Sequence, residues 1–455
     1  MTAKVAATTA DRDNHLDIAA DLIGRATAAG AEAADVMIVD SRSIGVSCRL
    51  GRAETLERAE TVEAGLRVFL GRRQAIAASS DLSPGGLADL VQRSLAMARE
   101  VPEDPFCGIA EPGEIDRGSH AVDSFDGTEM TAEGLLATAM AAEDAARSVA
   151  GVTNSEGAEA SWSTSRAAIA ASNGLAAAYR RSSGSLSVSV LAAGESGMER
   201  DYDYTAAVYA ADMRAPEEVG RAAGERTVRR LNPRKAGSAR VPVIFEPRVS
   251  RTLLGHLAGA VNGAAIARKT SFLRDKMGAR IFPAGVEIID DPLRARGLRS
   301  RPVDHEGIAT GPVAVVADGV LASWLLDLRS ARQLGLRPTG HGLRGTTTPP
   351  SPAPSNLYLA GGDRSAAALV GEVKSGLYVT ELIGFGVNSV TGDYSRGASG
   401  FWIENGQIAY PVSEITIAGN LLEMFSHLTR ADDLEFRYGT DAPTVRVDAM
   451  TVAGC

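Results

Sequence analysis

The stretch RAAIAASNGLAAAYR, residues 166–180, decides the fold class. Two short apolar runs, 166–171 and 175–180, flank the dipeptide Asn173-Gly174. Asn-Gly is the strongest short-range signal for a β-hairpin, because both central residues of the tight turn need a positive φ. The stretch therefore predicts two antiparallel strands joined at residues 173–174.

Strand and helix patterns surround this hairpin. Residues 36–39 form a buried run, and residues 44–50, 66–70 and 183–191 alternate apolar with polar side chains. Alternation of this kind is typical of an antiparallel sheet with one covered face. Apolar residues at helical spacing predict helices from Leu16 to a stop at Gly30, and over 87–98, 132–148 and 216–231. Ser83-Pro84 is a suitable N-cap and first-turn pair for the second helix.

The second half of the chain has a different pattern. Residues 232–237, Asn-Pro-Arg-Lys-Ala-Gly, predict a boundary. A strand over 241–245 and a helix over 249–267 come next, and then short β-like runs at 286–289, 313–316, 357–360, 401–403 and 445–447. We predict an α+β protein with two domains. Residues 1–235 form an N-terminal helix and antiparallel-sheet domain, and residues 236–455 form a β-rich C-terminal domain with a few helices.

Composition excludes several classes of protein. The 455 residues carry a net charge of −9, so no global attraction to nucleic acid or to an anionic membrane is expected. The N-terminus has no apolar signal-peptide core, and no apolar run reaches the roughly 20 residues that a bilayer requires. Cys48, Cys107 and Cys455 are odd in number and far apart, which indicates neither a disulfide framework nor a thiolate cage. We expect a cytoplasmic protein.

The familiar catalytic motifs are absent or out of context. Residues 340–345 match GxGxxG, but Thr346 to Pro350 cannot open the helix that a dinucleotide site needs, so a glycine-rich turn is the better interpretation. The chain has no GxxxxGK[ST] and no GxSxG motif. The only His-Glu dipeptide, His305-Glu306, has no second histidine four or five residues later.

Three of the six histidines deserve separate interpretation. His305 lies among Gly and Pro residues, so we expect a solvated loop histidine rather than a metal ligand. His256 stands alone on an apolar helix, where a satisfied, partly buried imidazole or an interface contact is the usual explanation. A Ser/His/Asp site or a rebuilt metal cluster stays open, and His256 and His341 are the residues to mutate first in testing it.

Many short motifs in order resemble the PmbA/TldE branch of the TldD/PmbA family. They cover nearly the whole chain, from the pattern around residues 65–69 and 79–83 to the closing Val447 to Gly454. Those in the second half are GHLAGA at 255–260, NG at 262–263, RKTSFL at 268–273, DHEGIAT at 304–310, PPSP at 349–352, SNLYL at 355–359, GFGVNSVTGDYS at 384–395 and ASGFWIEN at 398–405. His305 departs from the pattern, since the family more usually has an acidic residue there.

The resemblance implies one subunit of a two-subunit metallopeptidase that matures peptides and removes small or unfolded polypeptides. In that family the TldD-type subunit carries HExxxH on the matching helix, with two histidine zinc ligands, a glutamate base and a cysteine ligand near the C-terminus. Aligned on Arg268-Lys269, this chain has Gly255 and Ala260 at the two histidine positions and His256 at the glutamate position. Residues 437–443 lack the cysteine, and Cys455 is a poor equivalent.

These matches predict a subunit without zinc ligands or catalytic residues, partnered by a TldD-type subunit that holds the zinc. The partner's zinc would polarise the peptide carbonyl and its glutamate would act as general base. An extended or unfolded peptide would bind by adding to a sheet edge. The family's association with DNA gyrase is indirect, and the acidic charge predicts no direct nucleic-acid binding. Two alternatives stay open: a non-enzymatic peptide-binding homo-oligomer, including a homodimer of the chain alone, and an independent hydrolase.

Overall fold

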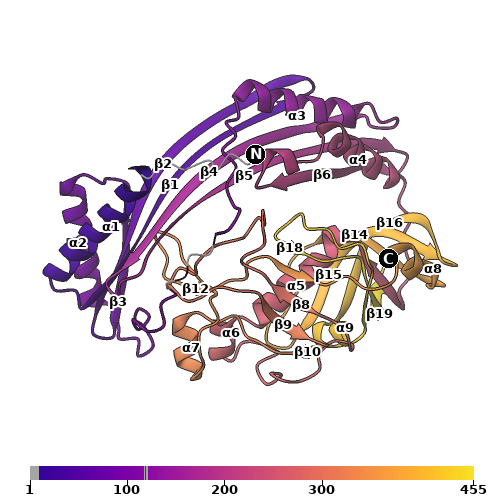
Figure 1. Ribbon diagram of the computed structural model, residues 1–455. Coiled ribbons are helices and arrows are strands. Elements are labelled where there is room, and N and C mark those ends of the chain that lie inside the picture. The colour runs from indigo at the N-terminus through magenta and orange to yellow at the C-terminus, as the bar shows by residue number, and fades with distance from the viewer. Residues whose placement is uncertain (1–9, 117, 119–120, 455) are drawn as a thin grey trace, which may run out of the picture.

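The N-terminal half is built on one six-stranded antiparallel sheet in the order β3-β2-β1-β4-β5-β6. The structure is a computed structural model that describes residues 10–116, 118 and 121–454. The six strands are β1 (Ala33–Arg49), β2 (Arg52–Leu70), β3 (Arg73–Ser79), β4 (Asn154–Ala171), β5 (Ala176–Gly194) and β6 (Gly197–Ala207). The four central strands hold 17 to 19 residues each, so the sheet is long enough to arch over the C-terminal half (Figure 1).

Helices cover this sheet in two groups. The first comprises α1 (Ala10–Ala28) and α2 (Pro84–Glu100), which bury Leu22 and Leu90 against β1 to β3. The second comprises α3 (Ala132–Arg147) and α4 (Pro216–Arg229), which pack against β4, β5 and each other. Figure 1 shows α1, α2 and α3 on the face of the sheet that points away from the C-terminal half. That half therefore meets the opposite face.

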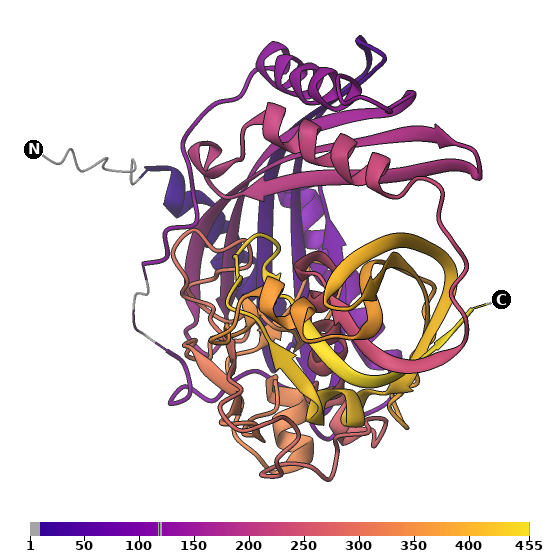
Figure 2. The same cartoon turned by 90° about the vertical axis from the view of Figure 1, so that its right-hand side faces the viewer.

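The C-terminal half contains a small closed barrel. Its strand order is β16-β15-β14-β7-β19-β17, and an additional pairing of β16 with β19 closes five of these strands into a ring (Figure 2). The strands are β7 (Ala239–Phe245), β14 (Ser375–Ile383), β15 (Asp393–Glu404), β16 (Gln407–Asn420), β17 (Leu428–Arg430) and β19 (Val445–Ala453). The apolar side of α5 (Pro247–Ala260) packs in the same core as the barrel strands.

A second, mixed sheet and several short elements complete this half. The sheet has the order β10-β9-β8-β13-β18. Its strands are β8 (Ile288–Asp290), β9 (Val313–Ala317), β10 (Val320–Leu321), β13 (Leu357–Leu359) and β18 (Thr440–Asp441). The remaining elements are β11 (Gly342–Leu343), β12 (Ser351–Pro352), the 3-10 helix Ala210–Asp212, α6 (Gly263–Ala267), α7 (Leu328–Leu334), α8 (Ala366–Gly371) and α9 (Leu421–Ser426).

The predicted α+β class is confirmed, and so is the hairpin at Asn173-Gly174. Ala170 pairs with Ala176 across the turn, and Gly174 has φ +95°. The four predicted N-terminal helices are also present, and the Ser83 hydroxyl accepts a hydrogen bond from the Gly86 N–H at the start of α2. None of the described helices is long and apolar enough to cross a membrane.

Several predicted element boundaries are wrong. Residues 36–39 and 44–49 belong to the single strand β1, and residues 176–180 and 183–191 belong to β5, because these long strands continue through polar segments. The helix predicted over 249–267 is two helices, because the Asn262 side chain accepts hydrogen bonds from the N–H groups of Ala264 and Ala265 and starts α6. Residues 340–345 contain the short strand β11, and no helix follows them. This agrees with a glycine-rich turn and not with a dinucleotide site.

Candidate functional site

The helix α5 carries the positions that the family comparison singles out. Pro247 occupies its first turn, and Leu253, Leu257 and Ala260 lie in the core. Gly255 is exposed, and a Cβ at this position would meet no atom within 4 Å. Ala260 is only 3% exposed. The two positions therefore face different sides of the helix, as expected for residues about 140° apart around its axis.

His256 packs edge-on against Tyr394, with ring centroids 5.9 Å apart. Its Nε2 atom and the Tyr394 hydroxyl are both buried without a hydrogen-bond partner among the described residues. Burial, together with the positive charge of Arg396, lowers the pKa of His256, so the imidazole is neutral at pH 7. The predicted partial burial is confirmed, but the predicted satisfaction of its polar atoms is wrong for Nε2.

His305 is buried, so the predicted solvated loop histidine is wrong. It is 4% exposed, because the Tyr179 ring on β5 covers it and its Nε2 lies 2.9 Å from the Tyr179 hydroxyl. Its Nδ1 lies against the backbone of Arg344, 3.1 Å from the N–H. Burial and the positive charges of Arg301 and Arg181 lower the pKa of His305 to about 4, which keeps the ring neutral.

His341 is also buried, at 2% exposed, and both of its ring nitrogens have neighbours. Nδ1 lies 2.8 Å from the Thr339 hydroxyl, and Nε2 lies 3.2 Å from a carboxylate oxygen of Asp290. The same carboxylate accepts hydrogen bonds from the backbone N–H and the hydroxyl of Ser355. His341 thus joins the segment after α7 to strand β8.

Sequence patterns did not reveal a group of buried carboxylates beside His305. Asp304 accepts hydrogen bonds from the N–H groups of Glu306, Ile308 and Gly342, and Glu306 accepts one from Leu328. Burial raises the pKa of both carboxyl groups, and the charge of Asp304 raises the pKa of Glu306 further. Within residues 10–116, 118 and 121–454, no group of three or more His, Cys, Asp or Glu side chains is arranged to hold a metal ion.

Two clusters of charged side chains join the N-terminal sheet to the C-terminal half. In the first, the Arg67 Nε atom on β2 donates to Asp35 on β1 at 2.7 Å, and Arg344 from the C-terminal half also pairs with Asp35. Arg344 donates a further hydrogen bond to the Gly65 carbonyl at 3.2 Å. All three charged residues are at most 4% exposed, so this contact is a buried part of the junction.

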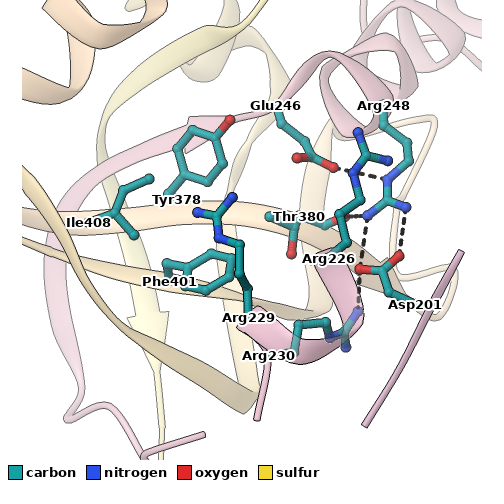
Figure 3. A pocket seen from close by; sticks show the side chains of 10 residues that line it. All are labelled: Asp201, Arg226, Arg229, Arg230, Glu246, Arg248, Tyr378, Thr380, Phe401 and Ile408. Carbon is teal, nitrogen blue, oxygen red and sulfur yellow. Dashed lines mark hydrogen bonds and ion pairs between the residues drawn. The ribbon is translucent and has the colours of Figure 1, made fainter. Parts of the chain in front are cut away.

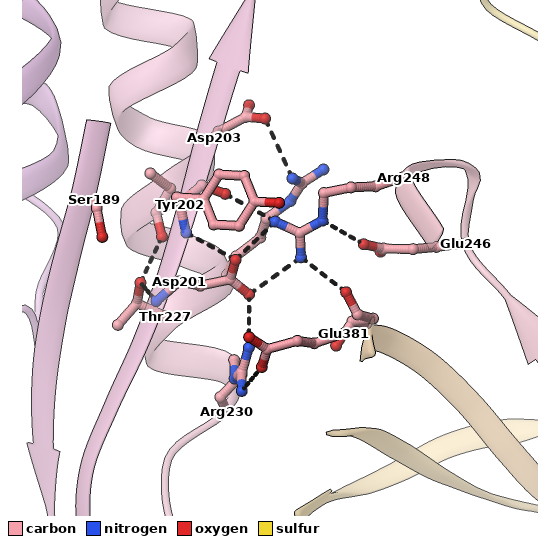
Figure 4. Close-up of polar contacts among 12 residues, drawn as sticks. Ser189, Asp201, Tyr202, Asp203, Thr227, Arg230, Glu246, Arg248 and Glu381 are labelled. Atoms are coloured by element: carbon pink, nitrogen blue, oxygen red, sulfur yellow. Dashed lines mark hydrogen bonds and ion pairs between the residues drawn. The ribbon is translucent and has the colours of Figure 1, made fainter. Parts of the chain in front are cut away.

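The second cluster is centred on Arg248 at the start of α5 (Figure 4). Its guanidinium donates to Asp201 on β6 at 2.7 Å and to Glu246 at 2.9 Å. Arg230, which follows α4, contacts the same Asp201 carboxylate at 3.3 Å and pairs with Glu381 on β14 at 2.5 Å. Burial alone would raise the pKa of Asp201, but the hydrogen bonds and charge of Arg248 outweigh it and hold that pKa below its usual range.

A cavity of about 210 Å³ opens beside this second cluster (Figure 3). Its walls come from both halves of the chain: β6 and α4 on one side, and α5, β14, β15 and β16 on the other. The residues of this site lie between Asp201 and Ile408 in the sequence, and no local motif marks them.

Comparison with known proteins covers most of the chain. Residues 34–98, 125–231 and 238–454 match domain 1, the central domain and the C-terminal domain of the PmbA/TldA metallopeptidases. The chain is 38% identical to the metalloprotease PmbA of Escherichia coli O157:H7 over 93% of this chain and 92% of that protein. It is 35% identical to the PmbA homologue of Haemophilus influenzae over 94% of each chain.

Solved structures have the same fold. A protein of Bacteroides thetaiotaomicron, described as a suggested modulator of DNA gyrase, superposes with a TM-score of 0.89 at 25% identity, covering 97% of this chain and 99% of that one. TldE of Thermococcus kodakarensis superposes with a TM-score of 0.85 at 20% identity, covering 96% of this chain and all of that one, which shows the shared fold. The chain belongs to the PmbA/TldD family of metallopeptidases.

Proposed function

We propose that this chain is the TldE/PmbA-type subunit of a cytoplasmic two-subunit zinc metallopeptidase that acts on unfolded or precursor peptides. In this proposal the chain itself holds no zinc, and a TldD-type partner supplies the metal and the catalytic residues. The chain completes the binding chamber and helps to hold an extended peptide.

The observation that carries the proposal is the chemistry of α5. At the two positions where the family's zinc histidines would fall, Gly255 and Ala260 have no side-chain donor atom, and Ala260 lies in the core. The residues present therefore do not fit a zinc site on this helix. His256, at the position of the glutamate base, packs against Tyr394 in a half-buried environment.

An exposed apolar loop supports a protein partner. Phe385, between β14 and β15, is 99% exposed, and Ile383 and Val390 beside it are 57% and 50% exposed. Large apolar side chains gathered on one loop are typical of surfaces that another protein covers. We therefore expect this loop to contact the TldD-type subunit.

The experiment measures zinc content and peptidase activity for the chain alone, for the TldD-type subunit alone and for the two mixed. The proposal expects no stoichiometric zinc in this chain, and cleavage of an unstructured peptide only after mixing.

Phe385→Ser should weaken complex formation measured by light scattering, whereas Met198→Ser, at a 70% exposed position in the β5–β6 hairpin, should not. Stoichiometric zinc with cleavage by the chain alone would overturn the proposal. A stable homo-oligomer of this chain that binds peptide but does not bind the TldD-type subunit would favour the non-enzymatic alternative.

A further inference from the structure

The cavity beside Arg248 is lined by four arginines, Arg226, Arg229, Arg230 and Arg248, and by the carboxylates Asp201 and Glu246. Three of these arginines are already paired: Arg248 with Asp201 and Glu246, Arg230 with Asp201 and Glu381, and Arg226 with Asp203 at 3.2 Å. The fourth, Arg229, is therefore the arginine of the cavity wall whose charge has no paired carboxylate among the described residues.

Arg229 has a ring beneath it but no carboxylate beside it. Its guanidinium carbon lies 5.0 Å from the centre of the Phe401 ring, and it forms no ion pair within the described part of the chain. Figure 3 shows its guanidinium next to the rings of Phe401 and Tyr378. Stacking on an aromatic face holds a guanidinium in place while its N–H groups stay free to donate.

Tyr378 adds a second donor that is not in use. Its half-buried side chain lines the cavity, and its hydroxyl has no hydrogen-bond partner among the described residues. Burial and the nearby Glu246 carboxylate raise the pKa of Tyr378, so the hydroxyl keeps its proton and can donate it in a hydrogen bond. Two adjacent unused donors, one of them charged, match the two oxygens of a carboxylate.

The remaining wall is apolar. The Phe401 ring, the Tyr378 ring and the Ile408 side chain face the cavity opposite the arginine cluster (Figure 3). The volume of about 210 Å³ is below the roughly 300–1,000 Å³ of pockets for drug-sized ligands, so one residue-sized group is the suitable occupant. A bare inorganic anion would leave this apolar wall without a contact.

We propose that this cavity binds the carboxylate of a small apolar carboxylic acid, with Arg229 and Tyr378 as its donors and Phe401 and Ile408 as the contact for its apolar part. The C-terminal residue of a peptide and a free apolar amino-acid derivative share this chemistry. The ligand would bridge α4 of the N-terminal half and the barrel strands β14 to β16. Where the ligand is a peptide, the inference deepens the proposed function by naming the part of the peptide that this chain holds, and every group that it uses belongs to this chain.

The test measures binding to the isolated full-length chain by calorimetry. The probes are the peptide acetyl-Ala-Ala-Leu with a free C-terminus, the same peptide amidated, acetyl-leucine and sodium acetate. We expect the free-acid peptide to bind and its amide to bind at least about tenfold more weakly, because the amide removes a charge-assisted hydrogen bond. If acetyl-leucine binds as tightly as the peptide, one apolar residue with a free carboxylate is sufficient as the ligand. If acetyl-leucine binds more weakly, the natural ligand is the C-terminus of a peptide.

Three variants locate the site. Arg229→Ala should weaken binding of the free-acid peptide about tenfold and Tyr378→Phe severalfold, as for lost charged and neutral hydrogen bonds. Arg234→Ala is the matched control, because Arg234 is also exposed and stacks on an aromatic ring, that of Tyr410 at 4.6 Å, but does not line the cavity. Equal binding of acid, amide and acetate, or equal loss in all three variants, would overturn the inference. Because no partner subunit is present, this result is independent of whether zinc is supplied by a second chain.

Discussion

Asp201 on β6 and Arg248 at the start of α5 form a buried ion pair that joins the two halves of the protein, with 2.7 Å between Oδ1 and Nη1. The two side chains are 3% and 6% exposed. The pair therefore sets the position of α5, the helix with the family's metal-site positions, relative to the N-terminal sheet.

Removing the carboxylate charge of this pair should be costly. We expect Asp201→Asn to lower the free energy of unfolding by about 3 kcal/mol, because Arg248 and Arg230 would both lose a buried counter-charge. Urea unfolding at pH 7 measures the change. Asp21→Asn is the control, since its pair with Arg25 is 2.8 Å long but largely exposed and should contribute little.

A double variant separates the loss of the pair from the burial of a lone charge. Asp201→Leu combined with Arg248→Met should recover part of the stability lost in Asp201→Asn, because it removes the buried guanidinium together with the carboxylate. Glu246, which then loses Arg248, has a pKa already raised by burial and can take up a proton. A double variant less stable than the single one would show that the hydrogen bonds of Arg248 to the Tyr202 and Thr380 carbonyls matter more than its charge.

Gly65 provides a test of the contact between β2 and the C-terminal half. A Cβ at Gly65 would lie 2.0 Å from the Thr346 carbonyl oxygen, so Gly65→Ala should force the two segments apart. We expect a loss of about 2 kcal/mol in unfolding free energy, typical of overpacking. Gly45→Ala in the neighbouring strand β1 should be nearly neutral, because its Cβ would meet only Ser161 at 3.9 Å. Equal effects of the two substitutions would contradict a close approach at Gly65.

The same contact explains what the sequence could and could not predict. Alternation in residues 66–70 predicted a strand, and Leu66 and Val68 do lie in the core under the helices. A sheet with one covered face would leave Arg67 exposed, yet Arg67 is 4% exposed, because residues around Arg344 cover the other face as well. The covering segment is nearly three hundred residues away, and no local pattern reports it.

The functional site, like the fold, was predicted from the sequence only where the residues involved are close together along the chain. The resemblance placed Gly255, His256 and Ala260 on one helix, and all three lie on α5, since helical spacing is local. The arginine cluster is assembled from helices and strands of both halves, so residue spacing carried no signal for it. Asp304 and Glu306 lie in one loop, and their burial depends on distant segments that local spacing does not reveal. The predicted boundary between residues 235 and 236 stays a prediction, although the chain passes there from α4 to β7. Cys455 lies outside the described residues.

His256 and His341 should respond in opposite directions to the same substitution. His256→Leu removes a buried Nε2 atom that has no hydrogen-bond partner in the described chain, so unfolding free energy should rise by about 1 kcal/mol. His341→Leu removes contacts with Thr339 and Asp290 and leaves polar groups unpaired, so the free energy of unfolding should fall by about 2 kcal/mol. Thermal unfolding of the two variants checks this. A loss of stability in both would indicate that a bound water satisfies His256.

Glu306 should make the protein less stable at alkaline pH. Its folded-state pKa lies above its ordinary value of about 4.3, because of burial and the charge of Asp304. A carboxyl group with a raised folded-state pKa contributes stability that is complete below the unfolded pKa and is lost as the pH rises through the folded pKa. Between pH 4 and 8 the wild-type protein should therefore lose stability with rising pH at this site.

Glu306→Gln should remove that loss. The glutamine can keep the hydrogen bond from the Leu328 N–H, which is 2.8 Å long in the wild type, but it carries no charge to bury. At pH 8 we expect the variant to be more stable than the wild type by at least about 1 kcal/mol, the equivalent of one unit of pKa, with a smaller difference at pH 5. Urea unfolding at both pH values measures it, with Glu57→Gln on the exposed part of β2 as the control. A variant that is less stable than the wild type at pH 8 would mean that the ionised Glu306 carboxylate, through Arg67, holds the junction together.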